Sequence, residues 1–285
     1  MSVEGEAPSG FAGGGGDASP LYRCLQVKMP VYFIHSEQIK DNKVKLDDRL
    51  AHHLRNVLRL KVGETLFLVD ERPRRYLTRV TASSPDRLVL AIEKEEAPPE
   101  ENRSVVRLGI GILKGEKMDW VVQKATELGV FRISPLVTQR VIARPRPERL
   151  NHQQNRWEKI AAEAAQQSGR WEIPKIDSPS DLPTLLADTA QSAFKFIFSP
   201  EVSHGSIRKS IQSSIDSSSL QGTLLIGPEG GWKPSEVAEA AQKGYLTISL
   251  GTRMLRSETA ALAALSIIQY EIDNKRMGMR SDGNH

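Results

Sequence analysis

Residues 250–265 read LGTRMLRSETAALAAL, and this stretch changes character halfway along. Its second half is small and aliphatic, as expected of a helix that packs against other elements. Its first half places two arginines and a glutamate between an apolar, strand-like run and that helix. Ser257 or Thr259 could cap the helix, which explains the hydroxyl groups but not the three charged side chains. We therefore interpret the stretch as a loop that contributes to a site.

A second unusual loop, GPEGGW at 227–232, also follows an apolar run directly. In an open parallel sheet, ligands bind beyond the carboxyl ends of the strands, so both loops should lie at one edge. Glycines there let the backbone approach a ligand closely. Glu229 would repel a phosphate, and no Gly-Lys-Ser/Thr follows, so a ligand with cationic character fits better. A tight turn before a helix remains the alternative for this loop taken alone.

From residue 105 onward, strand and helix patterns alternate, which predicts a parallel sheet covered by helices on both faces. The predicted strands are 105–113, 131–137, 194–199, 223–227 and 246–251, and the predicted helices are 115–130, 155–169, 235–244 and 257–273. The serine-rich residues 203–221 are predicted to form a surface loop.

Before residue 96 the pattern favours half-buried antiparallel strands in a small barrel. The predicted strands are 31–34, 66–69, 76–80 and 87–92, with one helix at 46–60. The predicted organisation is a disordered tail (1–28), a β-barrel domain (29–95), a linker (96–104), an α/β domain (105–275) and a disordered C-terminal tail (276–285).

Composition limits the function classes. The 285 residues are 39% hydrophobic and 26% charged, with a net charge of +4, which permits a nucleic-acid partner. The single cysteine, Cys24, excludes an internal disulfide and a thiolate zinc cluster, and the histidines lack metal-ligand spacing, so no metal is expected. No run approaches the about 18 apolar residues of a membrane span, and no secretory signal is visible. A reducing, cytoplasmic location is the simplest interpretation of one cysteine and no secretory signal.

Arginines cluster in three places: Arg55 and Arg59 in the predicted helix, Arg74 and Arg75 in a predicted hairpin, and Arg140 after a strand. Each group could be an ordinary solvated face. Together they indicate a phosphate-contacting surface that extends over both domains.

Five segments, in this order, resemble the bacterial ribosomal RNA small-subunit methyltransferase E family of the SPOUT superfamily. They are HHLRNVLR (52–59), KGEKMDWVVQKATELGV (114–130), RWEKIAAEAAQQSGR (156–170) with Pro174, LLIGPEGGW (224–232) and LGTRMLRSETAALAAL (250–265). The resemblance covers most of residues 30 to 272, and the last two segments together are highly specific.

The resemblance implies a PUA-like β-barrel that binds RNA, followed by an α/β domain with a deep trefoil knot. It implies a homodimer that transfers a methyl group from S-adenosylmethionine to N3 of one uridine in 16S ribosomal RNA, within the small ribosomal subunit.

Residue roles follow from the same resemblance. The predicted cofactor contacts are Leu225, Ile226, Gly227, Gly230, Gly231, Leu250, Gly251, Leu255, Thr259 and Ala260. Arg256 is the first candidate, and Arg140 the second, for stabilising negative charge on the uracil oxygens. Glu229 or Glu258 is predicted either to accept the N3 proton or to anchor backbone N–H groups. The predicted RNA contacts are Arg55, Arg59, Arg74, Arg75, Arg140 and Arg170.

Two other functions were compared with this one. A SPOUT methyltransferase that acts on another RNA, such as transfer RNA, would carry similar cofactor loops and differ in its first domain. A non-catalytic RNA-binding assembly factor is the alternative from another class, and the intact loops at 227–232 and 250–260 argue against it.

Overall fold

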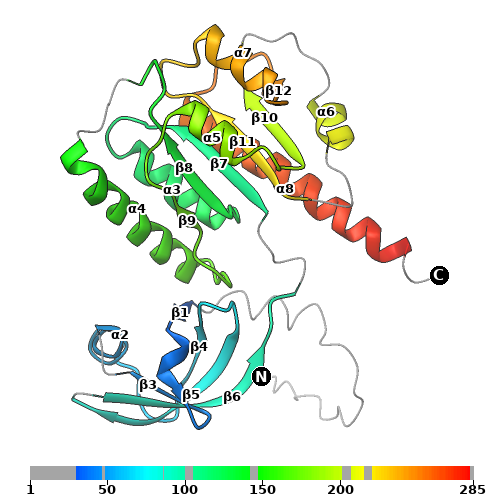
Figure 1. Ribbon diagram of the computed structural model, residues 1–285. Coiled ribbons are helices and arrows are strands. Elements are labelled where there is room, and N and C mark those ends of the chain that lie inside the picture. The colour runs from blue at the N-terminus through cyan, green and yellow to red at the C-terminus, as the bar shows by residue number, and fades with distance from the viewer. Residues whose placement is uncertain are drawn as a thin grey trace, which may run out of the picture.

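The computed structural model describes residues 30–46, 49–85, 87–99, 105–141, 147–200, 207–214 and 220–282. The chain forms two six-stranded sheets, β1–β6 in a smaller unit and β7–β12 in a larger one (Figure 1). The predicted tail 1–28 and residues 100–104 of the predicted linker lie outside the described residues.

The smaller unit is a sheet with the strand order β1-β4-β5-β6-β3-β2. Alternate residues of the long strands, such as Leu66, Leu68, Leu88 and Leu90, point into one core and are almost fully buried. The β1–β4 pair is parallel, so the expectation of antiparallel strands only was wrong for this pair. Its elements are β1 (Val31–Phe33), η1 (Ser36–Gln38), β2 (Ile39–Lys40), β3 (Lys43–Leu46), α2 (Arg49–His52), η2 (His53–Val57), β4 (Thr65–Val69), β5 (Arg75–Ser84) and β6 (Arg87–Glu96).

The predicted helix at 46–60 is two short helical pieces rather than one. α2 passes into the π-helical turn η2, in which Leu58 N donates to His53 O at 3.2 Å. The wider turn shifts the following side chains around the axis. Leu54 is buried, whereas Val57 and Leu58, at the end of the turn, are exposed.

The larger unit is a parallel sheet with the strand order β12-β10-β11-β7-β8-β9, as the alternating pattern predicts. Neighbouring residues in a strand face opposite sides, and both sides are apolar because both are covered. The strands are β7 (Val106–Gly111), β8 (Arg132–Leu136), β9 (Lys175–Ile176), β10 (Phe194–Phe198), β11 (Gly222–Ile226) and β12 (Leu246–Ile248).

Helices cover the two faces of this sheet (Figure 1). One core includes Ile110, Val122 and Leu265 and lies under α3 (Lys117–Glu127), α4 (Pro147–Gln167) and α8 (Ser257–Asp282). The other includes Leu185 and Leu225 and lies under α5 (Leu182–Asp188) and α7 (Pro234–Gln242). Within the described residues, no helix is both long and apolar enough to cross a membrane.

Two predictions about irregular segments were wrong. α8 continues to Asp282, so residues 276–282 are helical and not part of a disordered tail. The serine-rich segment contains the helix α6 (Ile207–Ser214). Ile211 is fully buried against α8, and Gln212 Nε2 donates to Glu271 Oε2 at 3.1 Å. One buried apolar residue in a polar segment is too weak a signal for periodicity to detect.

The two units meet at β5 and the segment that follows α4. Arg75 Nη2 donates to Gly169 O at 2.7 Å, and the guanidinium lies 3.9 Å from the centre of the Trp171 ring. The centre of the Phe67 ring lies 5.6 Å from the same guanidinium. A buried arginine on one unit is thus held by an aromatic ring and a carbonyl of the other.

Candidate active site at the strand ends

A cavity of about 370 Å³ lies at the carboxyl ends of β10 and β11, where a parallel sheet places its ligand sites. Three loops form it: one after β10, one after β11 and one between β12 and α8. The lining residues are Lys117, Phe198, Pro200, Ile226, Gly227, Pro228, Glu229, Gly231, Trp232, Met254, Leu255, Arg256, Ser257 and Ala260.

The GPEGGW loop is held in a tight conformation. Gly231 N donates to Pro228 O at 2.8 Å, and Gly231 has φ +68°, a conformation that favours glycine. Trp232 Nε1 donates to Phe198 O at 3.1 Å, which fastens the loop to the end of β10. A Cβ on Gly230 would lie 2.8 Å from the carbonyl oxygen of Arg140. The close backbone contact at Gly230 is therefore with the segment after β8.

The LGTRMLRSETA loop presents an unengaged arginine to the cavity. The Arg256 carbonyl accepts the Ala260 N–H at 2.8 Å, which begins α8, and its exposed side chain lines the cavity. In the part of the chain that is described, the Arg256 guanidinium makes no ion pair and no hydrogen bond. A free guanidinium at a cavity can contact a ligand carrying negative charge.

Lys117 of α3 is a residue of this site that sequence reasoning missed. Its Nζ lies 3.7 Å from Glu229 Oε1 and 3.5 Å from Glu258 Oε1. Glu229 Oε1 also accepts the Lys114 N–H at 3.0 Å. The second carboxylate oxygens of Glu229 and Glu258 are buried without a hydrogen-bond partner among the described residues. No local pattern could reveal this cluster, because its members come from three distant elements.

The structure brings together about half of the predicted cofactor contacts. Ile226, Gly227, Gly231, Leu255 and Ala260 line the cavity, together with Glu229 and Arg256. Leu225, Gly230, Leu250, Gly251, Thr259 and Arg140 do not line it.

Strand geometry explains one of these exclusions. Leu225 and Ile226 point to opposite sides of β11, and the Leu225 side chain is buried in the core under α5 and α7. Arg140 lies beside the loop instead, where Nη1 donates to Gly230 O at 3.3 Å. The apolar walls formed by Phe198, Trp232 and Met254 were not predicted.

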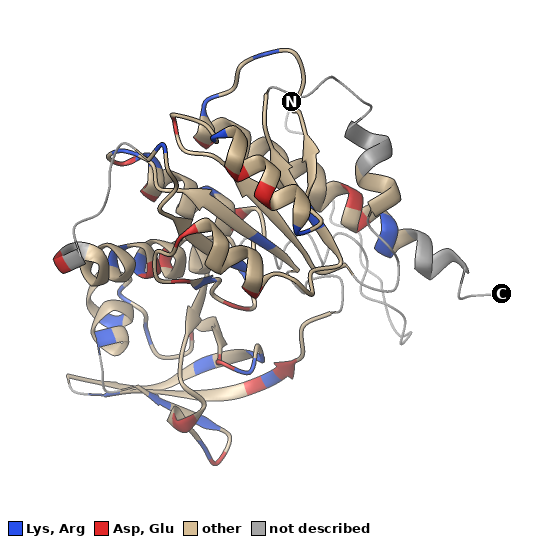
Figure 2. Ribbon diagram, turned by 45° about the horizontal axis from the view of Figure 1, so that its top comes forward, with Lys and Arg blue, Asp and Glu red and all other residues tan. Residues whose placement is uncertain are grey.

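Arg55, Arg59 and Arg74 lie on the smaller unit, where Lys and Arg occur among Asp and Glu (Figure 2). Arg59 and Arg74 are exposed, and Arg55 is half-buried and donates to Ser84 O. Asp70 Oδ1 accepts the backbone N–H of Arg74 at 2.9 Å, which orders the hairpin, and the Arg74 side chain is paired with Glu95.

The prediction that Arg75 and Arg170 contact RNA is corrected, because both are structural. Arg75 fills the contact between the units, and burial lowers the pKa of its guanidinium. Arg170 Nη1 donates to Thr126 O at 2.9 Å and to Val130 O at 2.8 Å at the end of α3. Burial lowers the pKa of Arg170 to about 10, so it stays charged at neutral pH. Neither guanidinium is available to a phosphate.

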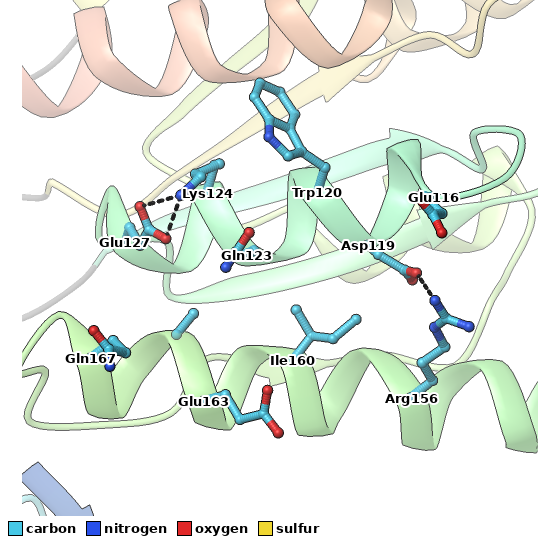
Figure 3. A pocket seen from close by; sticks show the side chains of 11 residues that line it. Glu116, Asp119, Trp120, Gln123, Lys124, Glu127, Arg156, Ile160, Glu163 and Gln167 are labelled. Atoms are coloured by element: carbon cyan, nitrogen blue, oxygen red, sulfur yellow. Dashed lines mark hydrogen bonds and ion pairs between the residues drawn. The ribbon is translucent and has the colours of Figure 1, made fainter.

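A larger cavity of about 660 Å³ lies between α3 and α4. Its charged side chains are largely engaged: Asp119 pairs with Arg156 at 2.5 Å, and Lys124 with Glu127 at 2.8 Å (Figure 3). It is formed by helix side chains, away from the strand ends. In the described ranges, no group of three His, Cys, Asp or Glu side chains is placed to hold a metal ion.

Comparison with known proteins defines the class of protein first. Residues 100–269 match the family model described as an RNA methyltransferase domain, and residues 46–93 match the RNA methyltransferase PUA domain. The chain is thus built as a two-domain RNA methyltransferase.

The relatives then define the family. Ribosomal RNA small subunit methyltransferase E of Bacillus subtilis (strain 168) is 32% identical over 255 residues, which cover 86% of this chain and 98% of that protein. The chain belongs to the ribosomal RNA small subunit methyltransferase E family.

Two similar structures were solved with S-adenosylmethionine. The Neisseria gonorrhoeae ribosomal RNA small subunit methyltransferase E is 31% identical, with a TM-score of 0.73 over 85% of this chain and 97% of that one. A Legionella pneumophila methyltransferase is 30% identical, with a TM-score of 0.74 over 86% of this chain and 98% of that one.

Proposed function

We propose that this protein transfers a methyl group from S-adenosylmethionine to N3 of one uridine in 16S ribosomal RNA of the small ribosomal subunit. The observation that carries the proposal is the cavity at the strand ends, where Arg256, Lys117 and Glu229 lie on an otherwise largely apolar wall. Family membership and the cofactor-bound relatives support it. A cytoplasmic location is part of this proposal, because ribosomal RNA of the small subunit is found there.

The residues of the cavity fit S-adenosylmethionine. A Cβ on Gly231 would meet no atom within 4 Å, so this glycine leaves room for a ligand beside the backbone, whereas Gly227 packs against the backbone of Gly231. Phe198 and Trp232 offer apolar surface to an adenosine. The unpartnered oxygens of Glu229 and Glu258 suit a cation and would repel phosphate. These groups, with Ile226, Leu255 and Ala260, form the proposed cofactor site. The other predicted contacts lie in the same strand and loops without lining the cavity, namely Leu225, Gly230, Leu250, Gly251 and Thr259.

When bound, S-adenosylmethionine supplies a methyl group already activated by a sulfonium, so the protein needs no nucleophile of its own. The chain's task is to align the acceptor and donor, and positioning can supply much of the acceleration. Loss of the N3 proton leaves negative charge on uracil O2 and O4. The free guanidinium of Arg256 is the group best placed to stabilise that charge, with Arg140 beside the Gly230 loop as the second.

The proton acceptor is the least defined part of the mechanism. Glu229 Oε1 is already engaged by the Lys114 N–H, which favours an anchoring role for this carboxylate. Its other oxygen and Glu258 Oε2 remain as candidate acceptors.

The trefoil knot is part of this proposal. β12 lies on the far side of β10 from β11, so the connection from β11 to β12 must pass β10. The loops after β10, β11 and β12 meet at the cavity as a consequence. That crossing supports a knotted arrangement of these loops.

A homodimer is also proposed. Several large apolar side chains of the larger unit are exposed, namely Trp120 (43%), Met254 (81%), Tyr270 (64%) and Met277 (61%). Trp120 extends from the side of α3 opposite α4 (Figure 3). Met254 lines the cavity, so a second copy over this surface would complete the wall of the site.

The test is mass spectrometry of nucleosides from small-subunit ribosomal RNA, with and without this gene. We expect 3-methyluridine to disappear without the gene and to be restored by the purified protein with S-adenosylmethionine. An unchanged level of 3-methyluridine would refute the proposed substrate and favour the alternative, a methyltransferase acting on another RNA such as transfer RNA. Absence of any methyl transfer, with RNA binding intact, would favour a non-catalytic assembly factor.

A further inference from the structure

Three charged side chains from distant elements meet beside the cavity. Lys117 comes from the start of α3, Glu229 from the loop after β11, and Glu258 from the first turn of α8, next to the cavity-lining Ser257. The ammonium of Lys117 faces both carboxylates, at 3.7 Å and 3.5 Å. The formal charges of these three groups sum to one negative charge, and the guanidinium of Arg256 on the same cavity wall is exposed, so solvent screens it more strongly.

The carboxylates of this cluster are only partly satisfied. Both contacts with Lys117 are longer than a normal hydrogen bond. Oε2 of Glu229 and Oε2 of Glu258 are buried and have no hydrogen-bond partner in the described part of the chain. An ionised oxygen buried in this way is costly unless a positive charge or a donor compensates it. The cluster is therefore arranged to favour a positively charged ligand.

We propose that this cluster makes the cavity select the cationic methyl donor over its neutral product. The inference rests on the proposed function, because it takes S-adenosylmethionine as the ligand. On transfer the carbon–sulfur bond breaks, its electron pair stays on sulfur, N3 forms the new bond to carbon, and the N3 proton leaves to a base. The sulfonium thereby becomes an uncharged thioether, and the excess negative charge no longer stabilises the ligand.

Lys117 acts here as a positioning residue. Two carboxylates that face the same ammonium repel each other, and the cation offsets part of that repulsion. The ammonium of Lys117 lies within 4 Å of both Glu229 and Glu258 and offsets only one of their two negative charges. It also links α3 to the loop after β11 and to the first turn of α8.

The test is calorimetric titration of the full-length protein with S-adenosylmethionine and, separately, with S-adenosylhomocysteine. Glu229→Gln and Glu258→Gln keep the size of each side chain and an oxygen that can accept the Lys114 N–H. Each should lower the preference for S-adenosylmethionine at least about tenfold, because one unit charge within about 10 Å, in an effective dielectric constant of about 20, has an effect of that size or larger. Affinity for S-adenosylhomocysteine should change less than about threefold.

Two controls separate the effect of the lost carboxylate charge from the effect of a changed loop shape. Glu163→Gln removes an exposed carboxylate that lines the other cavity and should leave the preference unchanged. Sinefungin carries a charged amine in place of the methylated sulfur. In Glu229→Gln and Glu258→Gln its affinity should fall by about the same factor as that of S-adenosylmethionine.

Equal losses for both ligands in both variants would overturn this inference, since the carboxylates would then act only on the shape of the loops. If one variant fails to fold, the other still decides. Failure of the unmodified protein to bind either ligand would overturn the proposed function itself, which keeps the two failures distinguishable.

Discussion

The guanidinium of Arg75 lies 3.9 Å from the centre of the Trp171 indole, across the contact between the two units. Arg75 was predicted to bind RNA, yet its side chain is buried and its Nη2 is used by Gly169 O. The same hairpin places Arg74, one residue earlier, on the surface. Adjacent strand residues face opposite sides, so two neighbouring arginines serve different purposes.

Replacing Arg75 with methionine should destabilise the protein by about 2–3 kcal/mol, since it removes a charge-assisted hydrogen bond and a cation–π contact. Chemical denaturation followed by tryptophan fluorescence measures this loss. Arg74→Ala is the matched control and should stay within about 0.5 kcal/mol, because its ion pair with Glu95 is exposed. Similar stabilities for the two variants would contradict a structural role for Arg75.

Gly230→Ala should weaken binding of S-adenosylmethionine at least about tenfold. The added Cβ would lie 2.8 Å from the Arg140 carbonyl oxygen, so the loop must shift away from its place beside the cavity. Gly115→Ala is a useful comparison: its φ of +64° makes alanine strained, but no atom lies within 4 Å of the new Cβ. It should cost about 1 kcal/mol of stability and leave cofactor affinity intact. Calorimetric affinity unchanged in Gly230→Ala would rule out this account of the loop.

Arg256→Ala should lower the rate of methyl transfer by about 10²–10³ while changing cofactor affinity less than about threefold, because its proposed partner is charge that develops in the transition state. Single-turnover rates and calorimetry measure the two quantities separately. Arg253 is exposed on the same loop and does not line the cavity, so Arg253→Ala should retain most of the rate. Parallel losses of rate and affinity in Arg256→Ala would indicate a structural role instead.

Reversing Arg55 and Arg59 to glutamate should weaken RNA binding and reduce the slope of log affinity against log salt by about 1.5–2, if each residue neutralises one phosphate. The salt dependence of binding to a small-subunit RNA fragment measures this change. Lys243→Glu, an exposed charge reversal at the end of α7, is the comparison and should have a much smaller effect. RNA affinity that survives the double reversal would place the RNA on another surface.

Periodicity was most successful in the larger unit. Strands such as 194–198 and 222–226 are apolar on both faces, and the helices between them carry one apolar stripe, so each element has a distinct pattern. Periodicity failed where the conformation depends on irregular backbone hydrogen bonding or on contacts between residues far apart in the chain. The π-helical turn before Leu58 and the buried Ile211 of α6 give no periodic signal. The parallel pairing of β1 with β4 depends on residues far apart in the chain.

The sequence by itself determined the alternation of strands and helices, the two loops that follow strands β11 and β12, and the family to which their residues belong. These features depend on neighbouring residues, and so they can be read along the chain. Only the tertiary structure decided that Lys117 meets Glu229 and Glu258. It also decided that Arg75 is buried, that Arg170 donates to two carbonyl groups, and that Arg256 has no ion pair or hydrogen bond within the described residues. Whether a charged side chain is paired, buried or available depends on elements brought together by folding, and residue type alone does not carry that information.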